Sequence, residues 1–129
     1  MDDDRGRGAD WFSAGGGDYA RFRPDYPAEV AAYVAQQAPG RTLAVDVGCG
    51  PGEFTRELAE HFDAVHGVDP SADQIAHATA TPGVTYTVAG AEALPVSAGA
   101  AAAITAAQAA HWFDLPRFYA EVRRIAVPG

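Results

Sequence analysis

Three alternating glycines lie in one short segment, residues 45–52, which reads Val-Asp-Val-Gly-Cys-Gly-Pro-Gly. The residues before the glycines form an apolar run typical of a buried strand, and a helical pattern follows them. Glycine in such a turn lets the backbone bend sharply and lets a ligand approach the main chain closely. The next helix begins with free N–H groups and the positive end of its dipole. The segment therefore predicts a ligand-binding turn between a strand and a helix.

The spacing of the glycines restricts the kind of ligand. A dinucleotide fingerprint requires Gly-x-Gly-x-x-Gly. Gly48 and Gly50 fit its first two positions, but Glu53 occupies the third. A carboxylate there would repel a pyrophosphate, which disfavours a nicotinamide-dependent oxidoreductase. No Gly-Lys-Ser/Thr sequence follows, so the turn is not a P-loop. The pattern favours a ligand without phosphates.

An acidic residue follows the second predicted strand. Asp69 lies 21 residues after Gly48, where a carboxylate can accept hydrogen bonds from both ribose hydroxyls of a nucleoside. The alternative is a structural Asx turn before Pro70. Together with the glycine turn, Asp69 indicates a nucleoside with a tail that carries no phosphate. S-adenosylmethionine fits, with its ribose at Asp69 and its methionine part over the turn.

The elements that position these residues alternate between strand and helix. In chain order we expect a helix over 27–37, a strand over 42–47, a helix over 53–61, a strand over 64–69, a helix over 72–80, strands over 84–88 and 102–106, and a helix after Asp114. The alanine-rich segment 98–110 is helical by propensity, but a strand restores the alternation. This is an α/β, Rossmann-like, doubly wound parallel sheet with right-handed crossovers. Numbering the expected strands in chain order, we predict the order 3-2-1-4.

Several local signals refine these elements. Ser71 and Gln74 form a capping-box pattern at the start of the helix after Asp69. Arg123 and Arg124 fall in the last turn of the final helix, where cations favour the dipole. Residues 1–18 are polar and rich in glycine, so we expect a flexible leader there and a folded part over 19–129.

Composition excludes several classes of protein. The 129 residues fit one domain, and a net charge of −8 argues against binding to a phosphate backbone, so we expect no nucleic-acid partner. No apolar run approaches 18 residues and no secretory signal opens the chain, so we expect no membrane partner and a cytoplasmic location. The single cysteine, Cys49, excludes an internal disulfide framework. The histidines lack metal-ligand spacing, so no metal site is expected.

Five segments in this order resemble the class I S-adenosylmethionine-dependent methyltransferases. The resemblance is narrower to the type 11 methyltransferase domain and its trans-aconitate methyltransferase-like members. It covers nearly all of the chain after residue 11. The segments that carry it are residues 19–27, 45–52, 67–69, 91–95 and 108–114.

This resemblance implies roles for individual residues. The positions implied to bind the cofactor are Tyr19, Arg23, Asp46, Gly48, Gly50, Gly52, Asp69, Ala91, Glu92 and Gln108. Among them, Tyr19 and Arg23 belong to a segment that closes over the cofactor, and Ala91 and Glu92 belong to a loop that meets the adenine. Gln108 and His111 are the implied catalytic residues, and Trp112 lines the acceptor.

Some alternatives stay open at the level of the sequence. His111 is a candidate general base or a packing residue beside Trp112, and Arg23 is a carboxylate clamp or a surface charge. Cys49 is better explained as a small turn residue than as a nucleophile. Two positions depart from the family pattern, since Gly90 and Ala102 stand where many relatives carry Asp.

The resemblance also sets expectations about activity. It implies methyl transfer from S-adenosylmethionine to a small-molecule acceptor such as a carboxylate. The family fold continues with three further strands where this sequence ends, so we expect a C-terminally truncated domain with an unpaired edge on the fourth strand. Such an edge favours self-association and weak turnover. The alternative is a cofactor-binding fragment or binding module without turnover.

Overall fold

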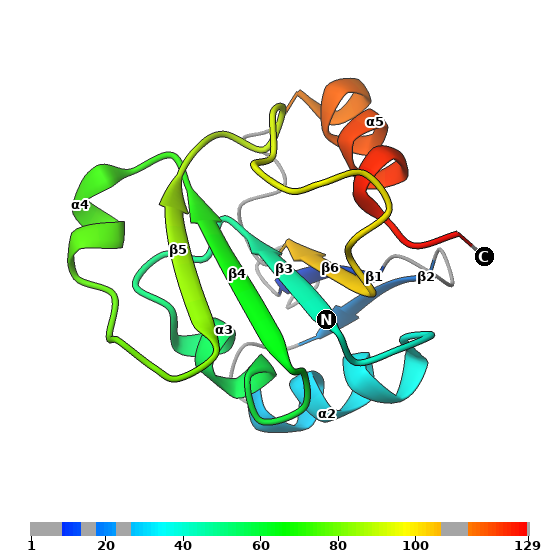
Figure 1. The fold of residues 1–129 in the computed structure, drawn as a ribbon, viewed down its shortest axis with the longest axis horizontal. Helices are drawn as coiled ribbons and strands as arrows, with labels where there is room; N and C mark the ends of the chain where they lie inside the picture. Colours follow the sequence, from blue (N-terminus) through cyan, green and yellow to red (C-terminus); the bar gives the residue numbers. More distant parts are fainter. Residues whose placement is uncertain (1–8, 14–17, 23–26, 107–113, 129) are drawn as a thin grey trace, which may run out of the picture.

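A four-stranded parallel sheet forms the centre of the molecule (Figure 1). The computed structural model describes residues 9–13, 18–22, 27–106 and 114–128. The sheet has the order β5-β4-β3-β6, and every neighbouring pair is parallel. Its strands are β3 (Leu43–Val47), β4 (Ala64–Asp69), β5 (Val84–Val88) and β6 (Ala103–Ala106). This confirms the predicted doubly wound topology, with the order reversing between β3 and β6.

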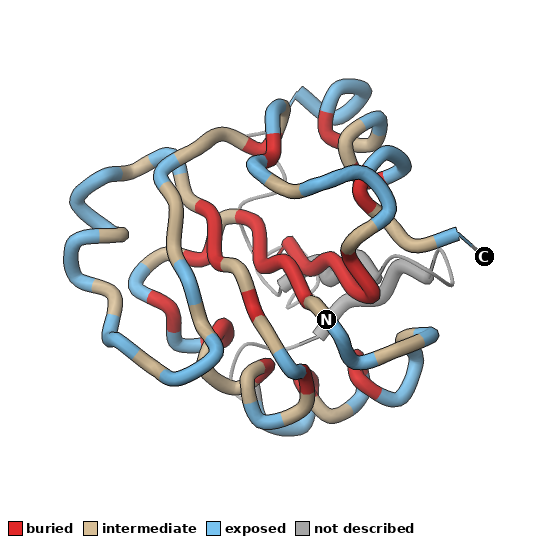
Figure 2. Tube along the Cα trace, in the orientation of Figure 1, coloured by how far each residue is buried: buried red, intermediate tan, exposed pale blue. Residues whose placement is uncertain are grey.

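Helices cover both faces of this sheet. On one face α2 (Pro27–Gln37) and α3 (Glu53–Leu58) pack with Ala44 and Val65. On the opposite face α5 (Leu115–Ile125) and the loop after β5 pack with Val45 and Val68. Successive strand residues thus belong to opposite cores, because side chains alternate across a strand. Buried residues accordingly run along β3 and β6, whereas β5 has none (Figure 2).

Two predicted helices are shorter in the structure. The first, α3, ends at Leu58 rather than at 61, because Glu60 and His61 bond three residues back, to Glu57 and Leu58. Such bonds tighten the last turn of a helix. The second, α4 (Ala72–Ala76), ends before the predicted residue 80, with His77 as its C-cap. Ser71 caps α4 as expected, since its side chain accepts a hydrogen bond from the Gln74 amide at 3.2 Å.

A two-stranded antiparallel hairpin precedes the main sheet. It consists of β1 (Ala9–Ser13) and β2 (Asp18–Phe22). The first strand, β1, lies within the segment expected to be a flexible leader, so the sequence pattern did not reveal it. The hairpin lies beside β6 (Figure 1), although its strands and β6 belong to separate sheets. Among the described strands, none therefore pairs with the outer edge of β6, as expected, although the hairpin lies near it.

None of the helices in the described part of the chain is long and apolar enough to cross a membrane.

Candidate functional site

The glycine turn lies at the carboxyl end of β3, beside the carboxyl ends of β4 and β5. Gly48, Gly50 and Gly52 all have positive φ angles, of 73°, 57° and 95°. Residues with a Cβ rarely adopt this conformation. A Cβ on Gly50 would meet only the Gln74 side-chain oxygen, at 4.0 Å. The turn therefore needs glycine for its backbone and leaves open space above Gly50.

Asp69 fastens the turn to the end of β4. Its Oδ2 accepts a hydrogen bond from the Gly50 amide at 2.9 Å, and its Oδ1 accepts one from the Ser71 amide at 2.8 Å. The Ser71 bond is the Asx turn that the sequence left open as an alternative. A carboxylate has about four acceptor sites, so each oxygen of Asp69 can accept one more donor. A structural and a ligand-binding role are thus compatible in this residue.

Asp46 lies beneath the turn and away from solvent. Only 1% of its surface is exposed. The Thr55 hydroxyl donates to its Oδ2 at 2.8 Å, and the Thr105 hydroxyl donates to its Oδ1 at 3.0 Å. Burial raises the pKa of Asp46 to about 6, against the opposing effect of the two hydroxyls. The residue therefore joins β3, α3 and β6 as an internal support of the site.

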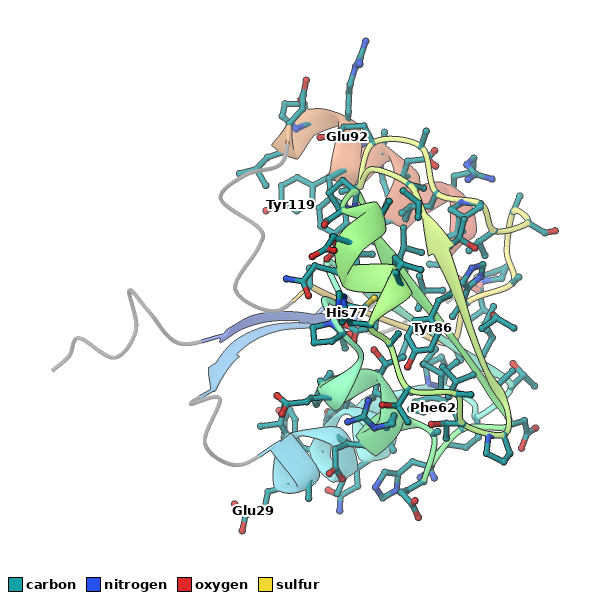
Figure 3. The ribbon with its side chains drawn as sticks, turned by 90° about the vertical axis from the view of Figure 1, so that its left-hand side faces the viewer. Glu29, Phe62, His77, Tyr86, Glu92 and Tyr119 are labelled. Atoms are coloured by element: carbon teal, nitrogen blue, oxygen red, sulfur yellow. The ribbon has the colours of Figure 1, made fainter. Side chains whose placement is uncertain are left out.

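The sequence did not single out Tyr86, which contacts two glycines of this region. Its partner across the β4–β5 ladder is Gly67. A Cβ on Gly67 would lie 2.9 Å from Tyr86 Cδ1 and 3.0 Å from Cys49 Sγ, and one on Gly52 would collide with the Tyr86 hydroxyl. The ring therefore fills the space that both glycines leave. Figure 3 labels the Tyr86 side chain. The signal in the sequence was an aromatic residue in an alternating strand next to a strand that contains glycine.

Cys49 is enclosed by the same residues. Burial, followed by the Asp46 and Asp69 carboxylates, raises the pKa of its thiol to about 12. The thiol is therefore protonated near neutral pH and is a poor nucleophile. This supports its interpretation as a small residue of the turn.

The loop after β5 carries Ala91 and Glu92. Ala91 is buried, and it packs in the core cluster that contains residues of α5. Glu92 Oε2 accepts a hydrogen bond from the Asp114 amide at 3.0 Å, just before α5. A Cβ on Gly90 would lie 2.9 Å from Glu92 Oε1. The Glu92 side chain thus connects the loop to the start of α5.

Other candidate residues lie outside the described part of the chain. These are Arg23, Gln108, His111 and Trp112. The backbone of Tyr19 belongs to β2, where it pairs with Phe12. The predicted catalytic and acceptor-lining residues therefore stay predictions. Over the described residues, no group of three or more His, Cys, Asp and Glu side chains could hold a metal ion.

Comparison with known proteins identifies the family. The family model described as "Methyltransferase domain" matches residues 44–129. A Dictyostelium discoideum protein described as a methyltransferase is 42% identical over 108 residues, which are 83% of this chain and 41% of that protein. An uncharacterized methyltransferase of Mycobacterium tuberculosis is 35% identical over 119 residues, 92% of this chain and 48% of that protein. The chain spans less than half the length of these relatives.

Solved structures give the same result. A structure described as a type II methyltransferase from Anaeromyxobacter dehalogenans is 48% identical, with a TM-score of 0.78 over 83% of this chain and 46% of its own. Geranyl diphosphate C-methyltransferase from Streptomyces coelicolor, in complex with S-adenosyl-L-homocysteine, is 25% identical, with a TM-score of 0.71 over 81% and 41%. Given the matched family and the shared parallel sheet, the chain belongs to the methyltransferase domain family, with the fold of the class I S-adenosylmethionine-dependent methyltransferases.

Proposed function

We propose that the chain binds S-adenosylmethionine across the glycine turn and Asp69, for methyl transfer to a small-molecule acceptor such as a carboxylate. The observation that carries this proposal is the hydrogen bond from the Gly50 amide to Asp69 Oδ2, at 2.9 Å. It brings the turn and the acid into one site at the carboxyl edge of the sheet, where ligands bind in open α/β folds. The complex of the Streptomyces relative with S-adenosyl-L-homocysteine supports the choice of ligand.

The residues present fit this cofactor. Space above Gly50 lets a methionine tail approach the main chain, and the free acceptor sites of Asp69 suit two ribose hydroxyls. Glu53, exposed in the first turn of α3, would repel a diphosphate at the same place. A tail without phosphates is therefore favoured over a dinucleotide.

When bound, this cofactor supplies an electrophilic methyl group. The chain's own contribution is to orient the cofactor and the acceptor and to exclude water. A carboxylate acceptor is already an anion, so it needs little help from an acid or a base. For a hydroxyl acceptor, His111 is the candidate base.

Calorimetric titration with S-adenosylmethionine and S-adenosylhomocysteine tests the proposal. We expect binding to the wild-type chain, and Asp69→Ala should weaken it by roughly 1.5–3 kcal/mol, the range for hydrogen bonds to a charged group. Asp73→Ala is the matched control, because it removes an exposed carboxylate from α4. Circular dichroism checks the fold, since Asp69→Ala also removes two backbone contacts.

Each outcome has a distinct meaning. Failure of the wild-type chain to bind either compound would overturn the proposed cofactor. Equal affinity in the wild type and Asp69→Ala would remove Asp69 from the ribose site. Incubation with a panel of carboxylic acids then tests turnover, and binding without methyl ester formation would overturn the proposal of a carboxylate acceptor.

A further inference from the structure

Two charged residues on α5 form a forked ion pair. Arg124 Nε donates to Glu121 Oε2 at 2.8 Å, and Arg124 Nη2 donates to Glu121 Oε1 at 2.8 Å. Side-chain exposure is 16% for Glu121 and 40% for Arg124. An exposed ion pair of this kind contributes little to stability by itself. Its importance here depends on what else the two side chains contact.

Both side chains also bind the backbone of the loop between β5 and β6. The Leu94 amide donates to Glu121 Oε1 at 2.7 Å. Arg124 donates to the Leu94 carbonyl through Nη2 and to the Val96 carbonyl through Nη1, each at 2.9 Å. The planar guanidinium group presents several donors in a fixed fork. The pair therefore fixes both polar groups of Leu94 and one of Val96.

This loop begins directly beside Asp69. The Ala89 amide donates to the Asp69 carbonyl at 3.0 Å. The loop then crosses toward α5, where Ala91 and Leu94 are buried in the core cluster with Phe118. Its backbone position is thus set at one end by the sheet and at the other by α5.

The order of the strands indicates which part of the cofactor meets the loop. The glycine turn follows β3, Asp69 ends β4, and the loop follows β5, and these strands are consecutive neighbours. A ligand with its tail at the turn and its ribose at Asp69 therefore extends its base toward the end of β5. The loop backbone is the part of the chain that the base reaches there.

We propose that Glu121 and Arg124 are positioning residues that hold this loop against the cofactor's base and so determine the preference for adenine. This inference rests on the proposed function. Neither residue touches the cofactor, and both act through the backbone of Leu94 and Val96. Loss of the pair releases the loop, so contacts with the base weaken more than contacts with the ribose and the tail.

The test compares two ligands that differ only in the base. S-adenosylhomocysteine and S-inosylhomocysteine are titrated into the wild type, Arg124→Ala, Arg124→Lys and Arg123→Ala. We expect the wild type to prefer the adenine compound. The preference is the Kd for S-inosylhomocysteine divided by the Kd for S-adenosylhomocysteine. We expect Arg124→Ala to reduce this ratio at least about fivefold and Arg124→Lys to reduce it less. Arg123→Ala is the matched control, because Arg123 is the exposed neighbour on the same helix.

The ratio separates positioning from mere stability. Partial unfolding weakens both ligands by the same factor and leaves the ratio unchanged. An unchanged ratio in Arg124→Ala, or a wild type without preference, would overturn this inference while leaving the proposed function intact. A wild type that binds neither ligand would overturn both. Should Arg124→Ala fail to fold, Glu121→Gln takes its place, since its amide oxygen can still accept from Leu94, and its expected fall in the ratio is smaller.

Discussion

Two carboxylates support the glycine turn, and their surroundings give them different properties. Asp69 is partly exposed and accepts hydrogen bonds from two backbone amides. Asp46 is buried and, within the described part of the chain, accepts hydrogen bonds from two threonine hydroxyls. Hydroxyl donors offset the desolvation of a buried carboxylate only in part, so the pKa of Asp46 stays raised. The inner acid is therefore sensitive to mildly acidic pH.

Asp46→Asn should change how stability depends on pH. The ordinary pKa of an aspartate side chain is 3.8, and that of Asp46 is raised to about 6 in the folded chain. Between these values the folded state binds more protons, so Asp46 makes the free energy of unfolding fall as pH rises from about 4 to about 6. At about 1.4 kcal/mol per pKa unit, the loss is at most roughly 3 kcal/mol. The asparagine variant does not titrate, so it lacks this decrease in the free energy of unfolding. Its side-chain amide can still form hydrogen bonds with the hydroxyls of Thr55 and Thr105.

Urea unfolding between pH 4 and 7 measures this effect. The free energy of unfolding of Asp46→Asn, relative to wild type, should rise across this range. Asp63→Asn is the control, because it removes an exposed acid from the turn before β4. A difference between Asp46→Asn and wild type that is constant with pH would contradict the prediction.

At the scale of elements, β4 and β5 fit together on one face of the sheet because Gly67, the partner of Tyr86 in the ladder, has no side chain. The Tyr86 ring occupies the space beside Gly67, and Cys49 Sγ borders the same space. Gly67→Ala forces the ring or the strand to move, which we expect to reduce stability by about 1–3 kcal/mol. The effect should be smaller in a Tyr86→Ala background, where only the contact with Cys49 Sγ remains, since neighbouring residues couple.

Thermal and urea unfolding of the two single variants and the double variant give the coupling energy. Gly40→Ala is the matched control, because a Cβ there would meet nothing within 4 Å. Additive effects of Gly67→Ala and Tyr86→Ala would show that the ring does not restrict Gly67.

Much of the element order could be predicted because periodicity and burial agree. Phe118, Val122 and Ile125, spaced by three and four residues, are all buried on α5. The strand at Ala103–Ala106 was predicted from alternation rather than propensity, and all four of its residues are buried. Contacts between distant segments were not predictable. The helix dipole explains equally well why Arg123 and Arg124 lie in the last turn of α5. Of these two, it is Arg124 that donates to the carbonyls of Val96 and Leu94, 28 and 30 residues earlier.

The candidate site was predictable to a similar degree. Glycine spacing indicated the turn because only glycine tolerates its three positive φ angles. The acid after β4 was indicated by its position, but its bond to Gly50 depends on the twist and register of two strands. Asp46 was expected at the cofactor, and that role stays a prediction. Its bonds to Thr55 and Thr105 could not be predicted, because these threonines come from other elements.

At the scale of the whole molecule, the hairpin of β1 and β2 lies beside β6, the last strand in the order of the main sheet. Deletion of residues 1–22 removes both strands, and with them the backbone that lies beside β6. Since uncovered edges pair with other chains, we expect the shortened chain to self-associate at concentrations where the full chain does not. Analytical ultracentrifugation measures this. Deletion of residues 1–8 alone leaves the hairpin and is the control, and equal behaviour of the two deletions would contradict the prediction.

The reversal of strand order between β3 and β6 also sets the time at which the site can exist. A ribosome makes β3, β4 and β5 within one continuous stretch, and each can pair with a strand close to it in sequence. The central strand, β3, can pair on its second side only after β6 has been synthesised, since Ala44 pairs with Ala103, 59 residues later. Pairings so distant in sequence close late in folding. Until Thr105 arrives, Asp46 lacks one of its two hydroxyl partners, so the support beneath the glycine turn is completed only after the turn itself has been synthesised.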